Sequence, residues 1–398
     1  MPALPTSPAL RPVPSGWHLL NTVAAAVGLG VVLAPWLYEA LLSMGLLQPL
    51  AEVSSSCGDT PAQWLSLRIG LGWGVLIGVG AALVQRLTRR RWAVAAVMLD
   101  LIVLYLSMQL FMYGSSKVFA TQFPRLWANL DTPPAELTPM RVAWQFFGYS
   151  RTYQQFLGWG EILPAVLLLF RRTRTLGAFV ATVVMLNVFV INLFFDVCVK
   201  IGSGTYLALA LLLLAQDADR LWQFFILHRP AAPRTLPATA EHFSRIGRWV
   251  YRGLGILLTL AMLYLVGQDS VGVMAYADEQ AQVLPVTGVW ETVQAERWAA
   301  DRWQPVAATD SVWPTRAYFQ AANAVLRNSF RRDRFITEPD SARPQKVLQL
   351  IARSEKNEYG APRPWQYALA GPDTLRLRGR WRQDSLRLTL KVRRDLMK

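Results

Sequence analysis

Three polar residues stand inside long apolar stretches of this sequence and have side chains suited to binding or moving a proton. They are Asp100, Glu161 and Asn187, each in a different stretch. Counted from the basic end of each stretch at about 1.5 Å per residue, they lie about 12 to 16 Å deep, so we expect them to meet. A carboxylate at that depth in lipid costs several kcal/mol when it is charged and unpaired. Glu161 is therefore expected to be protonated, hydrogen-bonded or in contact with water.

More polar residues continue from this depth toward the other end of the stretches. They recur at helical spacing, as Tyr105, Gln109, Tyr113 and Lys117 in one stretch and as Asn192, Asp196 and Lys200 after another. Residues four apart line one face of a helix, so the pattern predicts a polar track from mid-membrane to the outer surface. Two interpretations stay open. The residues form a ligand-binding or proton-handling site, or they hold helices and helix ends together through hydrogen bonds and an Asp196–Lys200 pair.

The residue types argue against most other cofactors. The histidines, His18, His228 and His242, all stand at or beyond the predicted ends of apolar stretches. Haem needs facing ligands inside a bundle and zinc needs clustered His and Cys, so we expect no haem, iron–sulfur cluster or zinc. The sequence also lacks a Gly-rich phosphate loop, a Gly-x-Ser-x-Gly turn and a Ser/His/Asp set on one side of the membrane. A bound quinone stays open, and any other cofactor is unknown.

Seven apolar stretches, each about 20 residues long, match the thickness of a bilayer. We predict membrane spans at 18–42, 64–84, 92–113, 152–170, 176–196, 204–226 and 249–267. A composition that is 53% hydrophobic over 398 residues fits a protein that is mostly embedded in a membrane. The chain then divides into a disordered, Pro-rich tail at 1–16, a helical transmembrane domain at 17–267 and an extracytoplasmic β-rich domain at 268–398.

The net charge of +15 is concentrated beside the spans. Arginines follow the second and fourth spans and fill the segment between the sixth and seventh: Arg86, Arg89, Arg90, Arg91, Arg171, Arg172, Arg174, Arg229, Arg234, Arg245 and Arg248. Lys/Arg-rich short loops stay cytoplasmic. We therefore predict a bacterial inner-membrane protein with a cytoplasmic N-terminus and a periplasmic C-terminal domain. Its first partner is the lipid bilayer, and nucleic acid is not expected.

Two further questions concern cleavage after the first span and the state of the two cysteines. Arg11 precedes the first span, as in a secretory signal peptide, but no small-x-small cleavage site follows it. Cys57 and Cys198 both fall outside in this topology, where an oxidising compartment allows a disulfide. A structural disulfide, two unpaired thiols and a redox-active pair stay open, although no Cys-x-x-Cys unit supports exchange chemistry.

Two segments predict close packing and a surface element. Gly70, Gly74 and Gly78 are four apart on one helix face, which lets another helix approach closely, within the chain rather than between two chains. The long outer segment from Gly114 to about Arg151 contains an aromatic run at 144–149. Its aromatic density is typical of a segment at headgroup depth or of a lid over an outward-facing cavity.

The period of the pattern changes after the last span. Residues 374–381 and 385–393 alternate apolar and basic side chains around a short polar turn, which predicts a β-hairpin with one buried face. Weaker strand candidates lie at 286–294, 315–320, 325–330, 334–338, 346–353 and 365–370. The expected product is a small antiparallel barrel or sandwich. Gly288-Val-Trp290 resembles the Gly-x-Trp start of lipocalin-like barrels, which hold apolar ligands.

A second resemblance covers about residues 92–215. Tyr113-Gly-Ser-Ser-Lys117, with Gly158-Trp-Gly-Glu161 and the Leu-rich, basic-ended helix after it, resembles the DoxX family. The resemblance implies a four-helix core and, for some relatives, a subunit of a quinone-linked oxidoreductase. Lys117 and Glu161 are the matching positions, which adds Lys117 to Glu161 and Asp100 as catalytic candidates. The extra spans, the long loop and the β domain depart from the family.

Three functions are compatible with these patterns. The first is a non-catalytic scaffold or binding protein whose outer domain recruits a protein partner or an apolar ligand. The second is an oxidoreductase subunit in which Glu161 handles a proton near a quinone-type headgroup, oriented by Asp100 and Asn187. In that case the Tyr105 to Lys117 face lines the approach, and the other polar residues of the track bind the ligand. The third is transport of a small solute.

Overall fold

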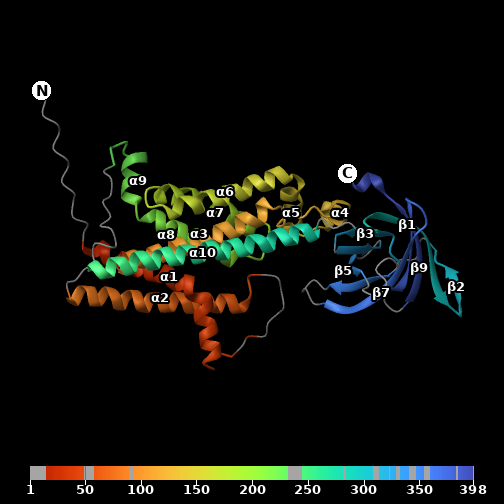
Figure 1. Ribbon diagram of the computed structural model, residues 1–398, viewed down its shortest axis with the longest axis horizontal. Helices are drawn as coiled ribbons and strands as arrows, with labels where there is room; N and C mark the ends of the chain where they lie inside the picture. The colour runs from red at the N-terminus through yellow and green to blue at the C-terminus, as the bar shows by residue number, and fades with distance from the viewer. Residues whose placement is uncertain are drawn as a thin grey trace.

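The computed structural model has a helical N-terminal part followed by a β-sheet part (Figure 1). It describes residues 15–48, 50, 58–88, 94–231, 244–280, 284–307, 313–321, 323–328, 332–339, 347–353, 359–381 and 384–397. Most of the predicted N-terminal tail therefore lies outside the described residues. The two parts lie end to end, with the barrel at one end of the helices.

The long helices form where the apolar stretches predict them. They are α1 (Ser15–Ser43), α2 (Pro61–Thr88), α3 (Val94–Val118), α6 (Arg151–Leu169), α7 (Arg174–Phe194), α8 (Lys200–Ala215) and α10 (Arg245–Gln280), and the short helix α9 (Ala218–Phe225) follows α8. Shorter elements between α3 and α6 are α4 (Trp127–Leu130), the 3-10 turn η1 (Pro134–Glu136) and α5 (Pro139–Tyr149). The long outer segment is thus largely helical.

Within the described residues, five helices are long and apolar enough to cross a membrane. They span Leu19–Ser43, Pro61–Thr88, Val94–Val118, Arg174–Phe194 and Arg245–Asp278. The helix predicted at 152–170 forms as α6 but is not one of these five. The segment expected to span at 204–226 is long and apolar enough only when α8 and α9 are taken together, and they meet at a bend of 73°, so it forms a broken span or a re-entrant loop rather than one continuous helix. At the bend, Asp217 accepts hydrogen bonds from Thr175 and Arg220, so polar contacts end the apolar run there.

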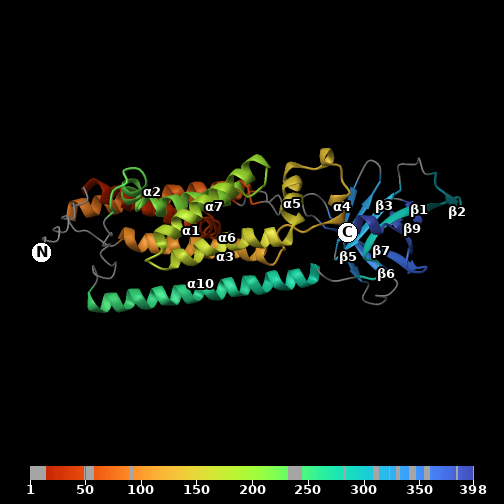
Figure 2. The same cartoon turned by 90° about the horizontal axis from the view of Figure 1, so that it is seen from above.

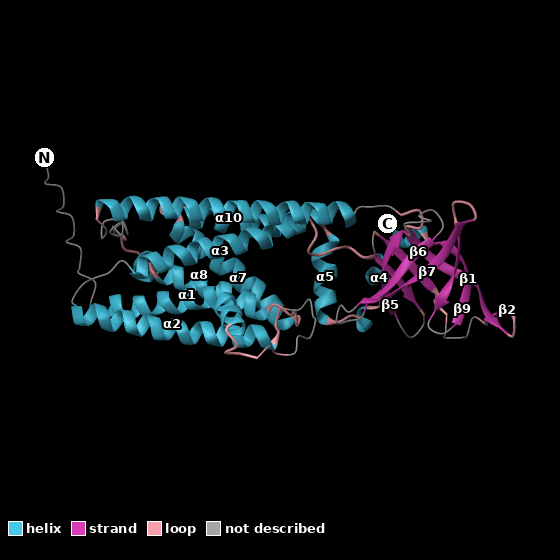
Figure 3. Cartoon of the chain, turned by 60° about the horizontal axis from the view of Figure 1, so that its bottom comes forward, coloured by secondary structure: helices cyan, strands magenta, loops and turns pink. Residues whose placement is uncertain are grey.

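Four helices enclose the core of the helical part. Helices α3, α6, α7 and α8 contact one another in a ring, and the core includes Ile102, Leu106, Leu168, Ala178 and Ala210, all fully buried. Helices α1 and α2 form a pair beside α3 and α8. Helix α10 runs past the predicted end at residue 267 and lies along the outside, next to α3 (Figures 2 and 3).

The glycine face of α2 packs against α1 within the chain, as predicted. A Cβ at Gly74 would lie 2.7 Å from the Cα of Val27, and one at Gly78 would lie 2.9 Å from the Cα of Val23. At Gly70 an added Cβ would meet the carbonyl oxygen of Gly30. The missing side chains therefore let the two backbones touch.

The C-terminal part is an antiparallel sheet that closes on itself. Its strands are β1 (Gly288–Ala299), β2 (Arg302–Pro305), β3 (Arg316–Gln320), β4 (Asn323–Arg327), β5 (Arg332–Pro339), β6 (Val347–Arg353), β7 (Tyr359–Leu369), β8 (Thr374–Trp381) and β9 (Asp384–Val392). The order is β2-β1-β3-β4-β5-β6-β7-β8-β9, and β1 also pairs with β9. The predicted hairpin and all six weaker strand candidates are confirmed, and the short β2 is an addition.

The barrel interior is filled with large side chains. Trp290, Trp365, Trp381 and Phe319 belong to one buried cluster together with the inward-facing leucines of β8 and β9. Eight-stranded barrels are just wide enough for side chains to fill them. The expectation of a lipocalin-like ligand space inside the barrel therefore finds no support in the described residues.

Candidate functional site

A buried ion pair links α3 to α6. Lys117 Nζ lies 2.7 Å from Glu161 Oε2, and the two side chains are only 6% and 2% exposed. Lys117 Nζ also donates to the carbonyl oxygen of Tyr113 at 3.4 Å. Glu161 is therefore buried in the helical part and hydrogen-bonded to Lys117, which is one of the three states that we expect for it.

Glycines and helix geometry position this pair. A Cβ at Gly114 would lie 2.8 Å from the carbonyl oxygen of Gly158, so the two glycines let α3 and α6 approach closely. Side chains on a helix lean toward its N-terminus, which carries the Lys117 ammonium back by about one turn to the level of Tyr113. The ammonium thus reaches a carboxylate deeper in the bundle than its own Cα.

Three tyrosines continue the polar track from this pair. Tyr206 on α8 donates to Gln109 Oε1 at 2.9 Å, and its ring meets those of Tyr105 and Tyr113 edge-on at 6.2 and 5.6 Å between centroids. The Tyr113 ring centroid lies 5.6 Å from Lys117 Nζ. Three residues of the predicted polar face of α3 therefore contact the same side chain, that of Tyr206. The sequence interpretation missed Tyr206, although a hydroxyl inside an apolar stretch was a usable signal.

The other polar residues of the track hold helix ends together. Asn192 Nδ2 donates to Ser203 Oγ at 3.0 Å in a buried contact between α7 and α8. Asp196 and Lys200 form a 2.7 Å ion pair in which the Asp196 side chain is 82% exposed. Asp59 accepts hydrogen bonds from the first backbone N–H groups of α8, which caps that helix. This arrangement matches the structural interpretation of Asp196 and Lys200.

Asp100 and Asn187 do not join Glu161. Asp100 is bound by Arg174 Nη1 at 2.6 Å and by the Tyr251 hydroxyl, about 25 Å along α3 from Lys117 at the helical rise. Asn187 is exposed on α7. The expectation that the three meet is wrong because it counted depth from helix ends as if they lay in one plane. Asp100 is level with the turn between α6 and α7, and Arg174 is the first residue of α7 after that turn.

The proposed cysteine pair is only half placed. Cys57 lies outside the described residues, and Cys198 is half-buried just before α8. Gly58, the next residue after Cys57, lies against this segment: a Cβ on it would be 3.4 Å from the Cys198 carbonyl oxygen. The disulfide stays a prediction.

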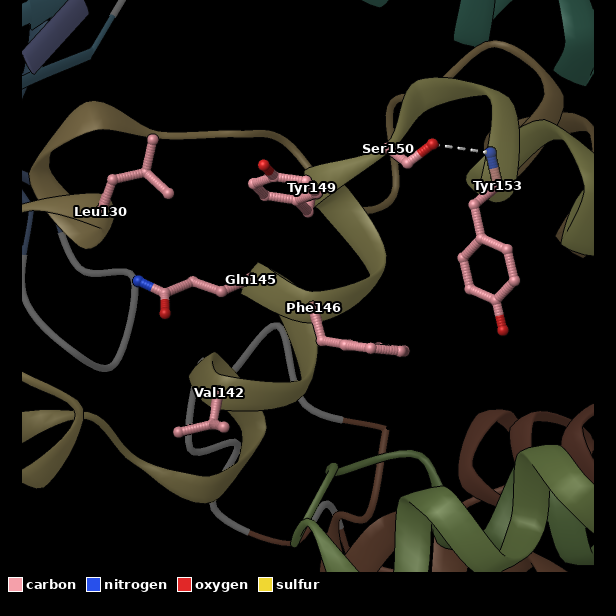
Figure 4. Close-up of a pocket in the computed structure, with 7 residues that line it drawn as sticks. All are labelled: Leu130, Val142, Gln145, Phe146, Tyr149, Ser150 and Tyr153. Atoms are coloured by element: carbon pink, nitrogen blue, oxygen red, sulfur yellow. Dashed lines mark hydrogen bonds between the residues drawn. The ribbon is translucent and has the colours of Figure 1, made fainter. Parts of the chain in front are cut away.

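The aromatic segment forms a hollow beside α5. It has a volume of about 630 Å³ and is lined by Leu130, Val142, Gln145, Phe146, Tyr149, Ser150 and Tyr153 (Figure 4). The side chains of Phe146 and Tyr149 are 65% and 71% exposed. Ser150 Oγ accepts a hydrogen bond from the Tyr153 N–H and so caps the start of α6. Lys117 and Glu161 are not part of this lining, so the hollow is separate from the ion pair.

A polar cluster attaches the barrel to the helical part. The carboxylate of Asp131, just after α4, accepts hydrogen bonds from Arg316 Nη1 and from the Tyr318 hydroxyl, both on β3. Arg327 Nη1 on β4 donates to the Asp131 carbonyl oxygen at 2.5 Å. We call these four residues the Asp131 clamp. Burial and the hydrogen bond to Asp131 raise the pKa of Tyr318 to about 12, so its hydroxyl stays a donor at neutral pH.

Contacts around the clamp extend the attachment. Gln320 on β3 accepts from the Trp127 N–H at 2.9 Å and donates to the Arg125 carbonyl oxygen at 2.8 Å. Ala128 of α4 packs with Val289 and Tyr318 in a small buried cluster. The barrel is therefore held through α4 as well as through its covalent link to α10.

Comparisons with known proteins give one relative. No protein-family model matches the chain. No solved structure matches it either. The chain is 37% identical over 122 residues to "Uncharacterized protein YwoB" of Bacillus subtilis (strain 168), an alignment that covers 31% of this chain and 78% of that protein. Because so much of that relative is covered, the chain belongs to the same protein family as YwoB.

Proposed function

We propose that this chain is a multi-pass protein of a bacterial inner membrane that holds its β barrel in a fixed position on the periplasmic side, as a non-catalytic scaffold that binds a partner. The helical part anchors the barrel, and the barrel presents the binding surface. The Asp131 clamp is the observation that carries this proposal.

The membrane assignment rests on exposed apolar surface. Helix α10 passes the length and apolarity criteria for a span, yet only 6% of its apolar window is buried in the chain. Its exposed side chains include Trp249, Ile256, Leu257 and Leu260. In water such a helix would expose a large apolar patch, whereas a bilayer covers it.

The orientation rests on charge. Arg171, Arg174 and Arg248 lie at the end of the helices that is remote from the barrel, where Asp100 and Tyr251 also meet. Arginine-rich turns stay in the cytoplasm, so the opposite end, with the barrel, is outside.

The clamp distinguishes a scaffold from a tethered domain. A domain that moves freely on a linker needs no second attachment, whereas here Asp131 of the helical part is bound by three side chains of the barrel, two at its carboxylate and one at its carbonyl oxygen. Each charge-assisted hydrogen bond of this kind contributes about 1.5 to 3 kcal/mol. The barrel surface that faces away from α4 is therefore presented at a defined height and angle.

Cysteine accessibility in whole cells tests the topology. Ser385→Cys places a thiol on the exposed face of β9, and Ser244→Cys places one just before α10 at the remote end. In a background without Cys57 and Cys198, a membrane-impermeant maleimide added to spheroplasts should label the first variant only. Permeabilised cells, in which both should react, provide the control. Labelling of Ser244→Cys alone would invert the orientation and end the proposal.

The buried ion pair favours a second function, proton handling in a quinone-linked oxidoreductase subunit. Lys117 and Glu161 are the two positions matched by the DoxX resemblance, and in this proposal the ring of α3, α6, α7 and α8 would serve as the four-helix core that the resemblance implies. In this role Glu161 binds and releases a proton, Lys117 holds it in place, and Tyr113 with Tyr206 orders the approach. Extraction of the purified protein for quinone tests it. Quinone should be present in the native protein and in Asp196→Asn but lost in Glu161→Gln.

A further inference from the structure

A row of cationic side chains runs along the outer face of the barrel. Arg376, Arg378 and Arg380 alternate with inward-facing residues of β8, and all three are exposed. Arg387 and Lys391 on β9 are also exposed, and Arg387 is the register partner of Arg378. The alternation that buries the leucines thus places five cations on one outer surface.

This surface is hollowed. A depression of about 790 Å³, which we call the cationic hollow, lies over it and is lined by Gln294, Glu296, Val347, Gln366, Arg376 and Arg378, with Arg387 and Thr389 among the rest. Its volume is within the range of about 300 to 1,000 Å³ that ligand sites occupy. The outer face therefore has the shape of a binding site as well as its charge.

The charge of the hollow is largely uncompensated. No carboxylate of the described residues forms an ion pair with Arg376, Arg378 or Arg380, and Glu296 reaches Arg387 only at 4.0 Å. Like charges directly opposite each other on a sheet are destabilising, which applies to Arg378 and Arg387. A second group of opposite charge would relieve this repulsion.

Trp303 arranges the two facing guanidinium groups. Its ring centroid lies 5.4 Å from the Arg378 Cζ and 4.2 Å from the Arg387 Cζ. Contact with an aromatic ring leaves the N–H groups at the guanidinium edge free to bind a carboxylate with two hydrogen bonds. The ring contact thus limits the positions of both guanidinium groups and leaves their N–H groups available to an anion.

The position of the hollow excludes lipid headgroups of the same membrane. Along β1, Glu296 at the hollow is about 23 Å from Val289, which contacts α4. The screening length in physiological salt is about 8 Å, so the charge of a membrane at the α4 end does not reach that far. Strand β2, which carries Trp303, lies at the far end of the barrel from the helices (Figure 1).

We propose that the cationic hollow binds an acidic, extended segment of a partner protein that has a carboxylate on every second residue. Arginines two apart on β8 are separated by about 6.6 to 6.8 Å, which is also the spacing of alternate side chains in an extended chain. This proposal rests on the scaffold function and names its partner chemistry. Carboxylates from such a segment would pair in register with Arg376 and Arg378 in the hollow and with Arg380, the next outward-facing residue of β8.

Peptide binding to the purified full-length protein tests the proposal. The probe is a fluorescent peptide of alternating glutamate and serine, measured by anisotropy beside a lysine–serine peptide and a single-stranded oligonucleotide. The test variant is Arg376→Gln/Arg378→Gln. The control, Arg302→Gln/Arg363→Gln, loses the same charge from exposed positions that do not line the hollow. Two exposed ion pairs contribute enough to predict about a tenfold weaker affinity in the test variant. Because salt screens exposed charges, the affinity of the unsubstituted protein should itself fall as the salt concentration rises.

Each outcome decides the proposal. It is supported if the glutamate peptide binds best and only the test variant weakens it. Equal loss in both double variants would show general charge attraction and overturn the site. Preference for the oligonucleotide would assign a phosphodiester partner and overturn the acidic segment. Because every substitution is at an exposed position, an unchanged unfolding midpoint confirms folding. Failure here leaves the clamp and the topology intact, so it is distinguishable from failure of the scaffold function.

Discussion

The burial of the Lys117–Glu161 pair predicts how much its loss lowers the free energy of unfolding. At 2.7 Å and an effective dielectric constant of about 20, the attraction is about 6 kcal/mol before desolvation is subtracted. Removing one partner from a buried pair leaves an uncompensated charge and costs about 3 to 5 kcal/mol. Lys117→Met and Glu161→Gln should each lower the free energy of unfolding by about 3 to 5 kcal/mol. The double variant should lose less than either single one, because it buries no unpaired charge.

The assay is unfolding of the purified protein in mild detergent with increasing dodecyl sulfate, followed by circular dichroism. Asp196→Asn is the matched control, because it removes a carboxylate from an ion pair of the same length that is 82% exposed on the Asp196 side. It should cost about 1 kcal/mol or less. If the single variants cost no more than this control, or if their costs simply add in the double variant, the pair is not the buried ion pair described.

Three further predictions concern packing, ionisation and the cysteines. Gly70→Ala should destabilise the protein by about 1 to 3 kcal/mol because its methyl group meets the α1 backbone, whereas Gly72→Ala, with nothing within 4 Å, should be neutral or stabilising; equal effects in detergent unfolding would contradict the α1–α2 packing. The raised pKa of Tyr318, about 12 against 10.0, means that unfolded chains lose this proton first, so stability should fall as the pH rises from about 10 to 12, and less so in Tyr318→Phe, as thermal melts across that range would show. Peptide mapping without reductant should recover Cys57 joined to Cys198, because Gly58 lies against Cys198, and exclusively separate peptides would refute the pairing.

Elements with strong periodicity were predictable from the sequence. The apolar stretches predicted the long helices, and the Arg/Leu alternation at 374–393 predicted β8 and β9 almost to the residue. These signals are local, because burial of one face sets the side-chain period. Gly70 and its partners were also informative, since absent side chains mark close helix approach wherever the partner lies.

Relations between helices were not predictable in the same way. Depth counted along each stretch placed Asp100 beside Glu161, but the offset of α3 against the α6–α7 turn instead pairs Asp100 with Arg174. Lys117 joined Glu161 because glycines on two helices allow contact, which a single sequence shows only as two separate patterns. The Asp131 clamp joins residues more than 180 positions apart, and nothing local to Asp131 indicated Arg316 or Tyr318.

In the proposed function, the Asp131 clamp fixes the barrel to the helical part. Spin labels at Thr152→Cys on α6 and Ser385→Cys on β9, both exposed, report the distance between the parts in a background without Cys57 and Cys198. We expect a narrow distance distribution that broadens in Asp131→Ala.

The matched control is Asp373→Ala, which removes a barrel carboxylate that pairs with Arg394 rather than with one of the four residues of the clamp. It should leave the distribution narrow. A broad distribution in the protein with an intact clamp, or one that stays equally narrow in Asp131→Ala and Asp373→Ala, would contradict the claim.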